Sequence, residues 1–358
     1  MYLIIAVQWK YKGSIGGMAQ RFVPISIELS SRGYNVKCLT TYSLVEHLGI
    51  DIEDPSLIII DDRVSRWAEV FTKNLFILRM IGKNKIKGIH LAGGSNLFIP
   101  TIKLAKLKGL KISCTFASRT LDMASYDNID AKNKWIKMLD FVDKIDVLNP
   151  SHDLIEWQDK ISVSPCSFPS RLLSYNEKKI SDKSNLAVFS GALVSTKNPL
   201  LACEVIKEAI ASDILPSDFL LYIFGSGELK KQIEVLKEDN EKYGFIIFGK
   251  QNEYFHILSK AKLFFSLQEY DNYPSQSLME AMYFGCNCIC TADGDTQKLF
   301  INTRNNIILD SRSPKFFAEE IRTIVFNEFN YTNYENISKN FTLSRFSDYF
   351  LNFLKIEE

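Results

Sequence analysis

Residues 263–296 carry the pattern that most constrains how this chain folds. Leu263–Leu267 is a short apolar run, and the acidic Glu269 follows it closely. A polar turn comes next, then apolar residues at helical spacing over 278–285, and a second apolar run over 286–291. The order strand, loop, helix, strand predicts a βαβ unit with polar side chains at the strand's carboxyl end, where open α/β sheets bind ligands. The N-terminus of such a helix presents free N–H groups and a positive dipole end, which favour phosphate.

The same alternation of strand and helix runs through the rest of the chain. In the first half of the chain, the first predicted strand is residues 2–7 and the last is residues 144–149. Residues 166–186 indicate a linker, because two prolines, Pro165 and Pro169, lie at its start and a polar, charged stretch follows them. We therefore expect an α/β protein of two doubly wound, Rossmann-like domains, which suits a length of 358 residues. The expected bounds are 1–165 and 187–340, followed by a helical tail at 341–358.

Composition excludes several classes of protein. The 43 basic and 42 acidic residues leave a net charge of +1, so no overall field favours nucleic acid. Seven cysteines without CxxC spacing argue against a zinc site or a disulfide framework, and they indicate a reducing compartment, the cytosol. No apolar stretch approaches the length of about 20 residues that spans a bilayer. The lysine clusters of 83–87 and 103–111 are either solvated helix faces or a docking surface for an anionic bilayer.

Glycines and one arginine mark further candidate sites. Gly16 and Gly17 open a predicted helix, where they allow close approach of the backbone to a ligand or simply form a tight turn. Arg119 follows the predicted strand 111–116, where its guanidinium would hold a phosphate or pair with a nearby aspartate. The Gly-x-Gly at 225–227 lacks the third glycine of a dinucleotide fingerprint, which argues against a nicotinamide oxidoreductase.

The sequence Glu280-Ala281-Met282, followed by Gly285, resembles the donor-sugar loop of GT-B glycosyltransferases of the retaining family 4. That family usually has two glutamates separated by seven residues, but the position eight before Glu280 is Asn272. Either Asp271 or Glu269 would then take the role of the first acid. The run 273–277 suggests a loop with one extra residue, which favours Asp271.

The resemblance implies a role for each matching position. Glu280 would bind ribose hydroxyls, and Asp271 or Glu269 would bind the hydroxyls of the donor sugar. Lys197 and backbone N–H groups near 275–277 would stabilise the leaving diphosphate, although Ala192 stands where the family has an arginine. The catalytic candidates are Asp271, Glu269 and Arg119. The donor-binding candidates are Gly16, Gly17, Lys197, Gly249, Lys250, Asn272, Tyr273, Pro274, Ser275, Gln276, Ser277 and Glu280.

The implied fold is GT-B, with two domains facing a cleft and a last helix that packs on the N-terminal domain. The implied activity is a retaining, hexosyltransferase-type transfer from a UDP- or GDP-linked sugar to a saccharide or lipid-linked acceptor. It requires no cofactor and no metal. The expected setting is bacterial surface polysaccharide synthesis, in the cytoplasm or peripherally at the inner membrane. The alternatives are a non-catalytic, glycosyltransferase-like partner subunit and a nucleotide-sugar epimerase.

Overall fold

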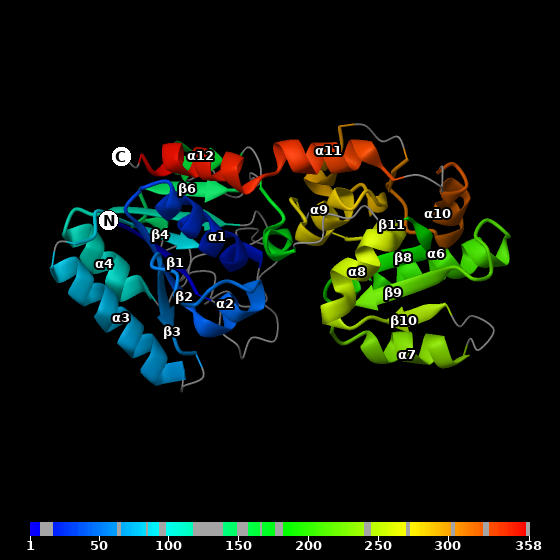
Figure 1. Cartoon of the computed structure of the whole chain (residues 1–358), viewed down its shortest axis with the longest axis horizontal. Coiled ribbons are helices and arrows are strands. Elements are labelled where there is room, and N and C mark those ends of the chain that lie inside the picture. The colour runs from blue at the N-terminus through cyan, green and yellow to red at the C-terminus, as the bar shows by residue number, and fades with distance from the viewer. Residues whose placement is uncertain are drawn as a thin grey trace. The chain divides into compact units, whose positions relative to one another are not determined.

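The computed structural model describes residues 1–7, 17–62, 66–83, 85–92, 98–116, 139–148, 157–164, 167–175, 182–239, 245–269, 273–301, 305–324 and 329–355. The chain forms two compact units, labelled by element in Figure 1. The N-terminal unit comprises Met1–Ser174 together with Thr342–Glu358, and the C-terminal unit comprises Tyr175–Phe341. The end of the chain thus returns to the unit in which the chain begins.

The N-terminal unit is built on a parallel sheet. Within the described residues it has seven strands in the order β3-β2-β1-β4-β5-β6-β7. The strands are β1 (Tyr2–Ala6), β2 (Val36–Thr41), β3 (Leu57–Ile60), β4 (Gly88–Ala92), β5 (Lys111–Phe116), β6 (Lys144–Val147) and β7 (Ile161–Val163). β1 and β4 are buried and almost wholly apolar, as expected for parallel strands covered on both faces.

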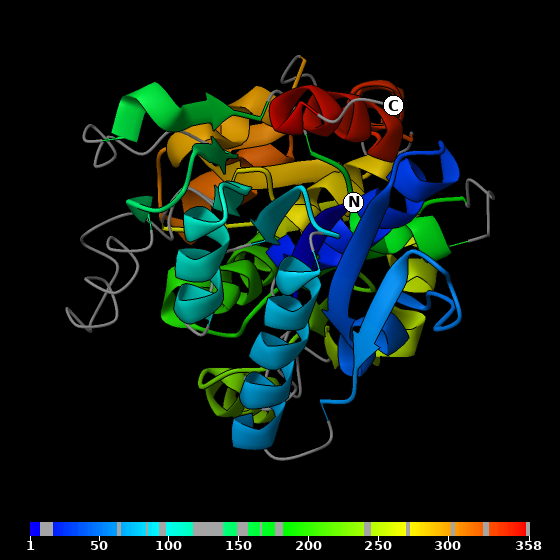
Figure 2. The same ribbon diagram turned by 90° about the vertical axis from the view of Figure 1, so that its left-hand side faces the viewer.

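Helices cover both faces of this sheet. They are α1 (Gly17–Ser31), α2 (Tyr42–Leu48), α3 (Arg66–Gly82), α4 (Ile99–Leu107) and α12 (Leu343–Leu354). The chain moves from β1 towards β3 through α1 and α2, and then back through α3 and α4, so right-handed crossovers place the two pairs on opposite faces. Figure 2, which looks at this unit, shows α3 and α4 side by side. Helix α12 packs against α1 on the other face.

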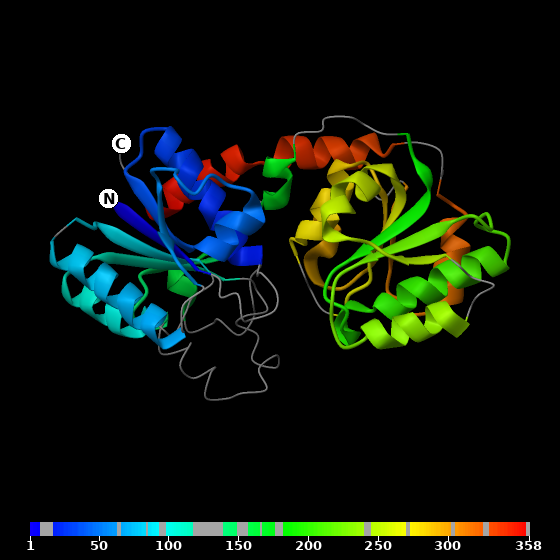
Figure 3. The same cartoon turned by 60° about the horizontal axis from the view of Figure 1, so that its bottom comes forward.

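The C-terminal unit repeats the architecture. Its described residues form a six-stranded parallel sheet in the order β10-β9-β8-β11-β12-β13. The strands are β8 (Ser184–Ser190), β9 (Leu220–Phe224), β10 (Ile246–Phe248), β11 (Ala261–Ser266), β12 (Asn287–Thr291) and β13 (Ile307–Leu309). The helices are α6 (Pro199–Ala211), α7 (Lys230–Asp239), α8 (Tyr254–Lys260), α9 (Gln276–Tyr283), α10 (Pro314–Ile321) and α11 (Tyr331–Asn340). Figure 3 shows helices on both faces of this sheet.

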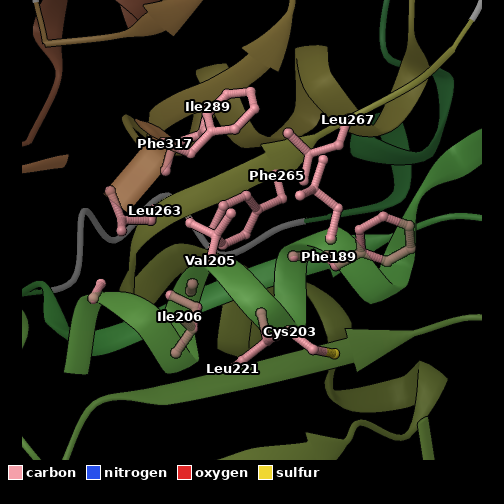
Figure 4. Packing of buried hydrophobic residues seen from close by; sticks show 14 of the residues in the cluster. Phe189, Cys203, Val205, Ile206, Leu221, Leu263, Phe265, Leu267, Ile289 and Phe317 are labelled. Atoms are coloured by element: carbon pink, nitrogen blue, oxygen red, sulfur yellow. The ribbon is translucent and has the colours of Figure 1, made fainter. Parts of the chain in front are cut away.

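The core of the C-terminal unit lies between the sheet and α6. Figure 4 shows Val205 and Ile206 of α6 packed over Leu263 and Phe265 of β11. All four side chains are buried. Because β11 lies between β8 and β12, this packing fixes the strand whose carboxyl end carries the central motif. The expected doubly wound α/β fold is confirmed in each unit.

Two details differ from the sequence-based expectations. The first sheet does not end at the strand predicted at 144–149, because the short strand β7 pairs with β6 beyond it. Structure also extends into the expected linker, 166–186, from both sides. Ser170–Ser174 form a 3₁₀ helix that contacts α1 and α2, and β8 begins at Ser184. The strand β7 and the 3₁₀ helix Ser170–Ser174 are too short to show a clear hydrophobic period.

Candidate active site

The carboxyl ends of β8, β9 and β11 are tied together by main-chain hydrogen bonds in the C-terminal unit. The N–H of Glu269, after β11, donates to the carbonyl of Thr196, after β8, at 3.1 Å. The N–H of Gly191, also after β8, donates to the carbonyl of Phe224 in β9 at 3.0 Å. Three loops that are distant in the sequence therefore form one edge, as expected for a ligand site in an open α/β sheet.

The Gly-x-Gly turn after β9 has a packing role. A Cβ atom on Gly225 would lie 1.8 Å from the carbonyl oxygen of Gly191, and one on Gly227 would lie 2.4 Å from that of Leu193. Any side chain at either position would push the loops after β8 and β9 apart. These glycines are therefore required by the close approach of two backbones.

Lys197 reaches the end of β11. Its Nζ donates a hydrogen bond to Oε1 of Gln268, whose Nε2 donates to Oγ of Ser266 at 3.1 Å. Gln268 is buried, so its side chain is held and in turn holds the ammonium group. The predicted diphosphate-binding lysine is thus placed beside the loop that leads into α9.

Arg312, after β13, lies at the same edge and was missed by sequence reasoning. Its Nη2 is 3.4 Å from the carbonyl oxygen of Gln268 and 2.6 Å from Oδ2 of Asp293. Gln268 therefore joins two cations, Lys197 through its side chain and Arg312 through its main chain. The only sequence signal for Arg312 is a position three residues after an apolar run, which many surface arginines share.

The loop into α9 and the first turn of that helix contain six of the twelve predicted donor-binding positions, 272–277. Ser275 is the N-cap, since its Oγ accepts a hydrogen bond from the N–H of Leu278 at 3.4 Å. The peptide bond between Tyr273 and Pro274 is cis. Gln276 is the first residue of the helix, so the positive end of the helix dipole lies at the end of this loop.

Glu280 is fully buried on α9. Its Oε2 accepts a hydrogen bond from the hydroxyl of Tyr254 on α8 at 3.0 Å. The Tyr254 ring is itself held edge-on by Phe224, with ring centroids 5.0 Å apart. Because the carboxylate has no exposed surface here, a ribose hydroxyl can reach it only if neighbouring side chains move aside. Sequence reasoning did not predict the partner on α8.

The remaining predicted positions are placed as follows. Gly249 donates its N–H to the carbonyl of Ile223 at 3.0 Å, and a Cβ there would meet the Phe224 ring at 2.2 Å. Lys250 and Glu269 are exposed. Gly17 is the first residue of α1, in the N-terminal unit. Gly16, Arg119, Asp271 and Asn272 lie outside the described residues, so their roles stay predictions.

The described part of the chain contains neither a cluster of metal ligands nor a membrane-spanning helix. There, no three His, Cys, Asp or Glu side chains are grouped so as to hold a metal ion. None of the described helices is long and apolar enough to cross a membrane.

Comparison with known proteins agrees with this architecture. Residues 173–342 match the family model of glycosyl transferases group 1. No curated protein sequence matches the chain. Among solved structures, a glycosyltransferase from Rickettsia africae is 13% identical, covers 99% of each chain and has a TM-score of 0.67. Anabaena HepE in complex with UDP and glucose is 10% identical over 99% of each chain, with a TM-score of 0.68. The pneumococcal O-GlcNAc transferase GtfA, with UDP and GlcNAc, is 9% identical over 99% of each chain, with a TM-score of 0.71.

The fold is therefore that of the GT-B glycosyltransferases, and the resemblance seen in the sequence is confirmed at this level. Residues 173–342, most of which lie in the C-terminal unit, are similar to the glycosyl transferases group 1.

Proposed function

We propose that this protein is a glycosyltransferase that moves a hexosyl group from a nucleoside diphosphate sugar to a hydroxyl of a saccharide or lipid-linked acceptor, with retention of configuration. The observation that carries the proposal is the meeting of Lys197, Arg312 and the N-terminus of α9 at one edge of the sheet. Two side-chain cations and the positive end of a helix dipole in one place suit a diphosphate leaving group.

In the proposed step, an oxygen of the acceptor hydroxyl forms a bond to the anomeric carbon of the donor sugar. The bond from that carbon to the diphosphate oxygen breaks, and the diphosphate leaves with the bonding electrons. The acceptor proton passes to the departing phosphate oxygen. Lys197 stabilises the negative charge that develops on the diphosphate, and no cofactor or metal takes part.

Arg312 supplies the second positive charge at this site. The resemblance places an arginine at the position of Ala192, which has no charge to offer. Arg312 reaches the same residue, Gln268, from the opposite side of the β11 end. Its pairing with Asp293 would orient the guanidinium without occupying all of its hydrogen-bond donors, because a guanidinium carries five N–H groups.

The donor sugar is proposed to bind Asp271 or Glu269. Glu269 is exposed, and its main chain is fixed by the hydrogen bond to Thr196, so its carboxylate starts from a defined position. Glu280 stays the proposed ribose-binding residue, with Tyr254 orienting its carboxylate. Arg119 and the Gly16-Gly17 loop are proposed to contribute from the N-terminal unit.

UDP is the first donor nucleotide to test, because two of the structural relatives described above are complexes with UDP. We further propose a role in bacterial surface polysaccharide synthesis, that is, of lipopolysaccharide, capsule or exopolysaccharide. We place the enzyme in the cytoplasm, peripherally at the inner membrane, since its described cysteines are free thiols and a reducing compartment keeps them so.

The test is a thermal-shift panel of UDP, GDP, ADP, CMP and their sugars, without metal and with a chelator. A ligand at about 100 times its Kd should stabilise the native state by about 2.7 kcal/mol. Lys197→Ala and Arg312→Ala should each weaken binding by about tenfold, because each removes a charge-assisted hydrogen bond worth about 1.5–3 kcal/mol. The matched control is Lys315→Ala, an exposed lysine on α10.

Two further variants separate binding from structure at Glu280. Glu280→Gln should raise the donor Kd, whereas Tyr254→Phe should mainly lower stability. Equal donor binding by Glu280→Gln and the wild type would reject the ribose role. A complete panel without any thermal shift would instead favour the non-catalytic partner subunit.

A further inference from the structure

One stretch of the N-terminal unit has a strongly uneven charge. Residues 70–121 contain eight lysines and two arginines but no aspartate or glutamate, whereas the whole chain has a net charge of only +1. The stretch includes most of α3, all of α4 and the segments between them. Lys106 pairs with Asp143 outside the stretch, but no acidic residue within the stretch offsets its positive charge, which favours a basic surface.

The same two helices expose large apolar side chains. Phe71 on α3 is 67% exposed and Leu75 is 49% exposed, while Leu107 at the end of α4 is 83% exposed. Phe76, beside Leu75, is 37% exposed. Isolated exposed apolar residues are common, but these four lie on two neighbouring helices that pack together, as Figure 2 shows.

The helical positions place apolar and basic residues on one surface. Phe71, Leu75 and Arg79 are four residues apart, so they form a single exposed stripe along α3. Lys83 continues the stripe past the end of that helix. On α4, exposed Lys103 and Lys108 lie near Leu107. We call this surface, defined by Phe71, Leu75, Phe76, Arg79, Lys83, Lys103, Leu107 and Lys108, the α3–α4 face.

We propose that the α3–α4 face docks on an anionic phospholipid bilayer. Phenyl and leucyl side chains beside lysines are the combination that enters the boundary between headgroups and acyl chains while the ammonium groups contact lipid phosphates. The face supplies both parts, and the charge of the stretch that forms it is complementary to an anionic leaflet. Contact by this face needs no membrane-spanning segment.

Other occupants fit this surface less well. A nucleic acid offers phosphates to the lysines but leaves Leu75 and Leu107 unburied. A second copy docked symmetrically would bring this basic surface against itself, and like charges at an interface are unfavourable. Of these three occupants, the bilayer matches both the apolar and the basic side chains.

The experiment is vesicle flotation with the full-length protein. Vesicles of phosphatidylcholine alone are compared with an equimolar mixture of phosphatidylcholine and phosphatidylglycerol, at about 0.1 M and about 1 M salt. Binding should require the anionic lipid and fall steeply at high salt. The triple variant Lys83→Gln, Lys103→Gln, Lys108→Gln should bind about 100-fold more weakly, since each lysine near an anionic surface contributes about fivefold. Phe71→Ser with Leu75→Ser should weaken binding by about tenfold.

The controls carry the same changes elsewhere. Lys231→Gln, Lys237→Gln and Lys315→Gln remove three exposed lysines of the C-terminal unit, and Ile52→Ser with Val235→Ser removes two apolar side chains of similar exposure. Equal losses in test and control variants, or binding that is indifferent to lipid charge, would overturn the proposal. So would a dimer, seen by sedimentation, that is lost in Phe71→Ser with Leu75→Ser. Donor binding is measured separately, so failure here leaves the proposed transfer reaction standing.

Discussion

His90 lies in β4, in the middle of the sheet of the N-terminal unit, and it is fully buried. Its Nδ1 is 2.9 Å from Oγ of Ser113, and its Nε2 is 3.1 Å from Oγ1 of Thr115. The rings of Phe22 and Phe350 pack against it, with centroids 4.8 Å and 4.6 Å away. It is therefore a core histidine.

Burial makes His90 a determinant of acid stability. Burial lowers the pKa of His90 from 6.5 to about 3. Below pH 6.5 the unfolded chain binds a proton that the folded chain cannot take up. The free energy of unfolding therefore decreases as the pH is lowered. The loss should approach about 1.4 kcal/mol per pH unit until the folded pKa is reached. His90→Asn, which keeps polar atoms near Ser113, should remove this contribution.

The measurement is urea unfolding of wild type and His90→Asn at several pH values between about 6 and about 4. The free energy of unfolding should change more steeply with pH in the wild type than in the variant. The difference in slope should correspond to the uptake of up to one proton on unfolding. Burial raises the pKa of the neighbouring Asp146, which acts in the opposite direction, but it is present in both proteins. His256→Asn, at an exposed position on α8, should follow the wild type. Parallel curves for wild type and His90→Asn would contradict the prediction.

At the scale of the element, α12 is held by one buried carboxylate and a group of aromatic rings. Asp146 in β6 accepts hydrogen bonds from Thr115 at 2.8 Å, from Ser164 at 2.7 Å and from Tyr349 of α12 at 2.6 Å. Phe346 and Phe350 of α12 are fully buried, and both pack edge-on against Phe22 of α1. Polar and apolar contacts together fix the helix on the sheet of the N-terminal unit.

Tyr349→Phe should lower the free energy of unfolding by about 1–3 kcal/mol, because Asp146 would lose one donor while remaining buried. The measurement is denaturant unfolding, extended to a double-mutant cycle with Asp146→Asn. A coupling energy near zero would show that the hydrogen bond carries none of the effect. Tyr331→Phe is the matched control, since Tyr331 is 62% exposed.

At the scale of the whole molecule, the two units have different connectivity. The C-terminal unit is one continuous segment, Tyr175–Phe341, with a core of its own. The N-terminal unit needs two segments, because Thr342–Glu358 supplies α12. Folding of the N-terminal unit therefore depends on residues at both ends of the chain.

We accordingly expect the fragment 175–341 to unfold cooperatively when it is expressed alone. The fragment 1–174 should be unfolded or aggregated, since Phe22 and Asp146 would lose their partners on α12. Circular dichroism and thermal melts of both fragments are the measurements. Adding a synthetic peptide of residues 342–358 should restore a cooperative transition to fragment 1–174. A stable fragment 1–174 without the peptide would show that α12 is dispensable.

The fold class and much of the site loop followed from the sequence. Apolar runs such as 263–267 and the helical spacing after Ser275 are local patterns, and a parallel strand buried on both faces produces them directly. The short strand β7 could not be predicted in this way, because three residues are too few to show a period. The site positions Asp271 and Asn272, which lie outside the described residues, keep the status of predictions.

Contacts between distant residues were decided by the tertiary structure alone. Tyr349 and Asp146 are 203 positions apart, and Arg312 and Gln268 are 44 apart. No periodicity links such pairs, because their meeting depends on how strands and helices stack. By itself, the sequence determined two α/β units and a loop that resembles the donor-sugar loop of glycosyltransferases, since local pattern sets secondary structure. Only packing decided that Glu280 is buried against Tyr254 and that Lys197 and Arg312 both contact Gln268, since such contacts form only in the assembled core.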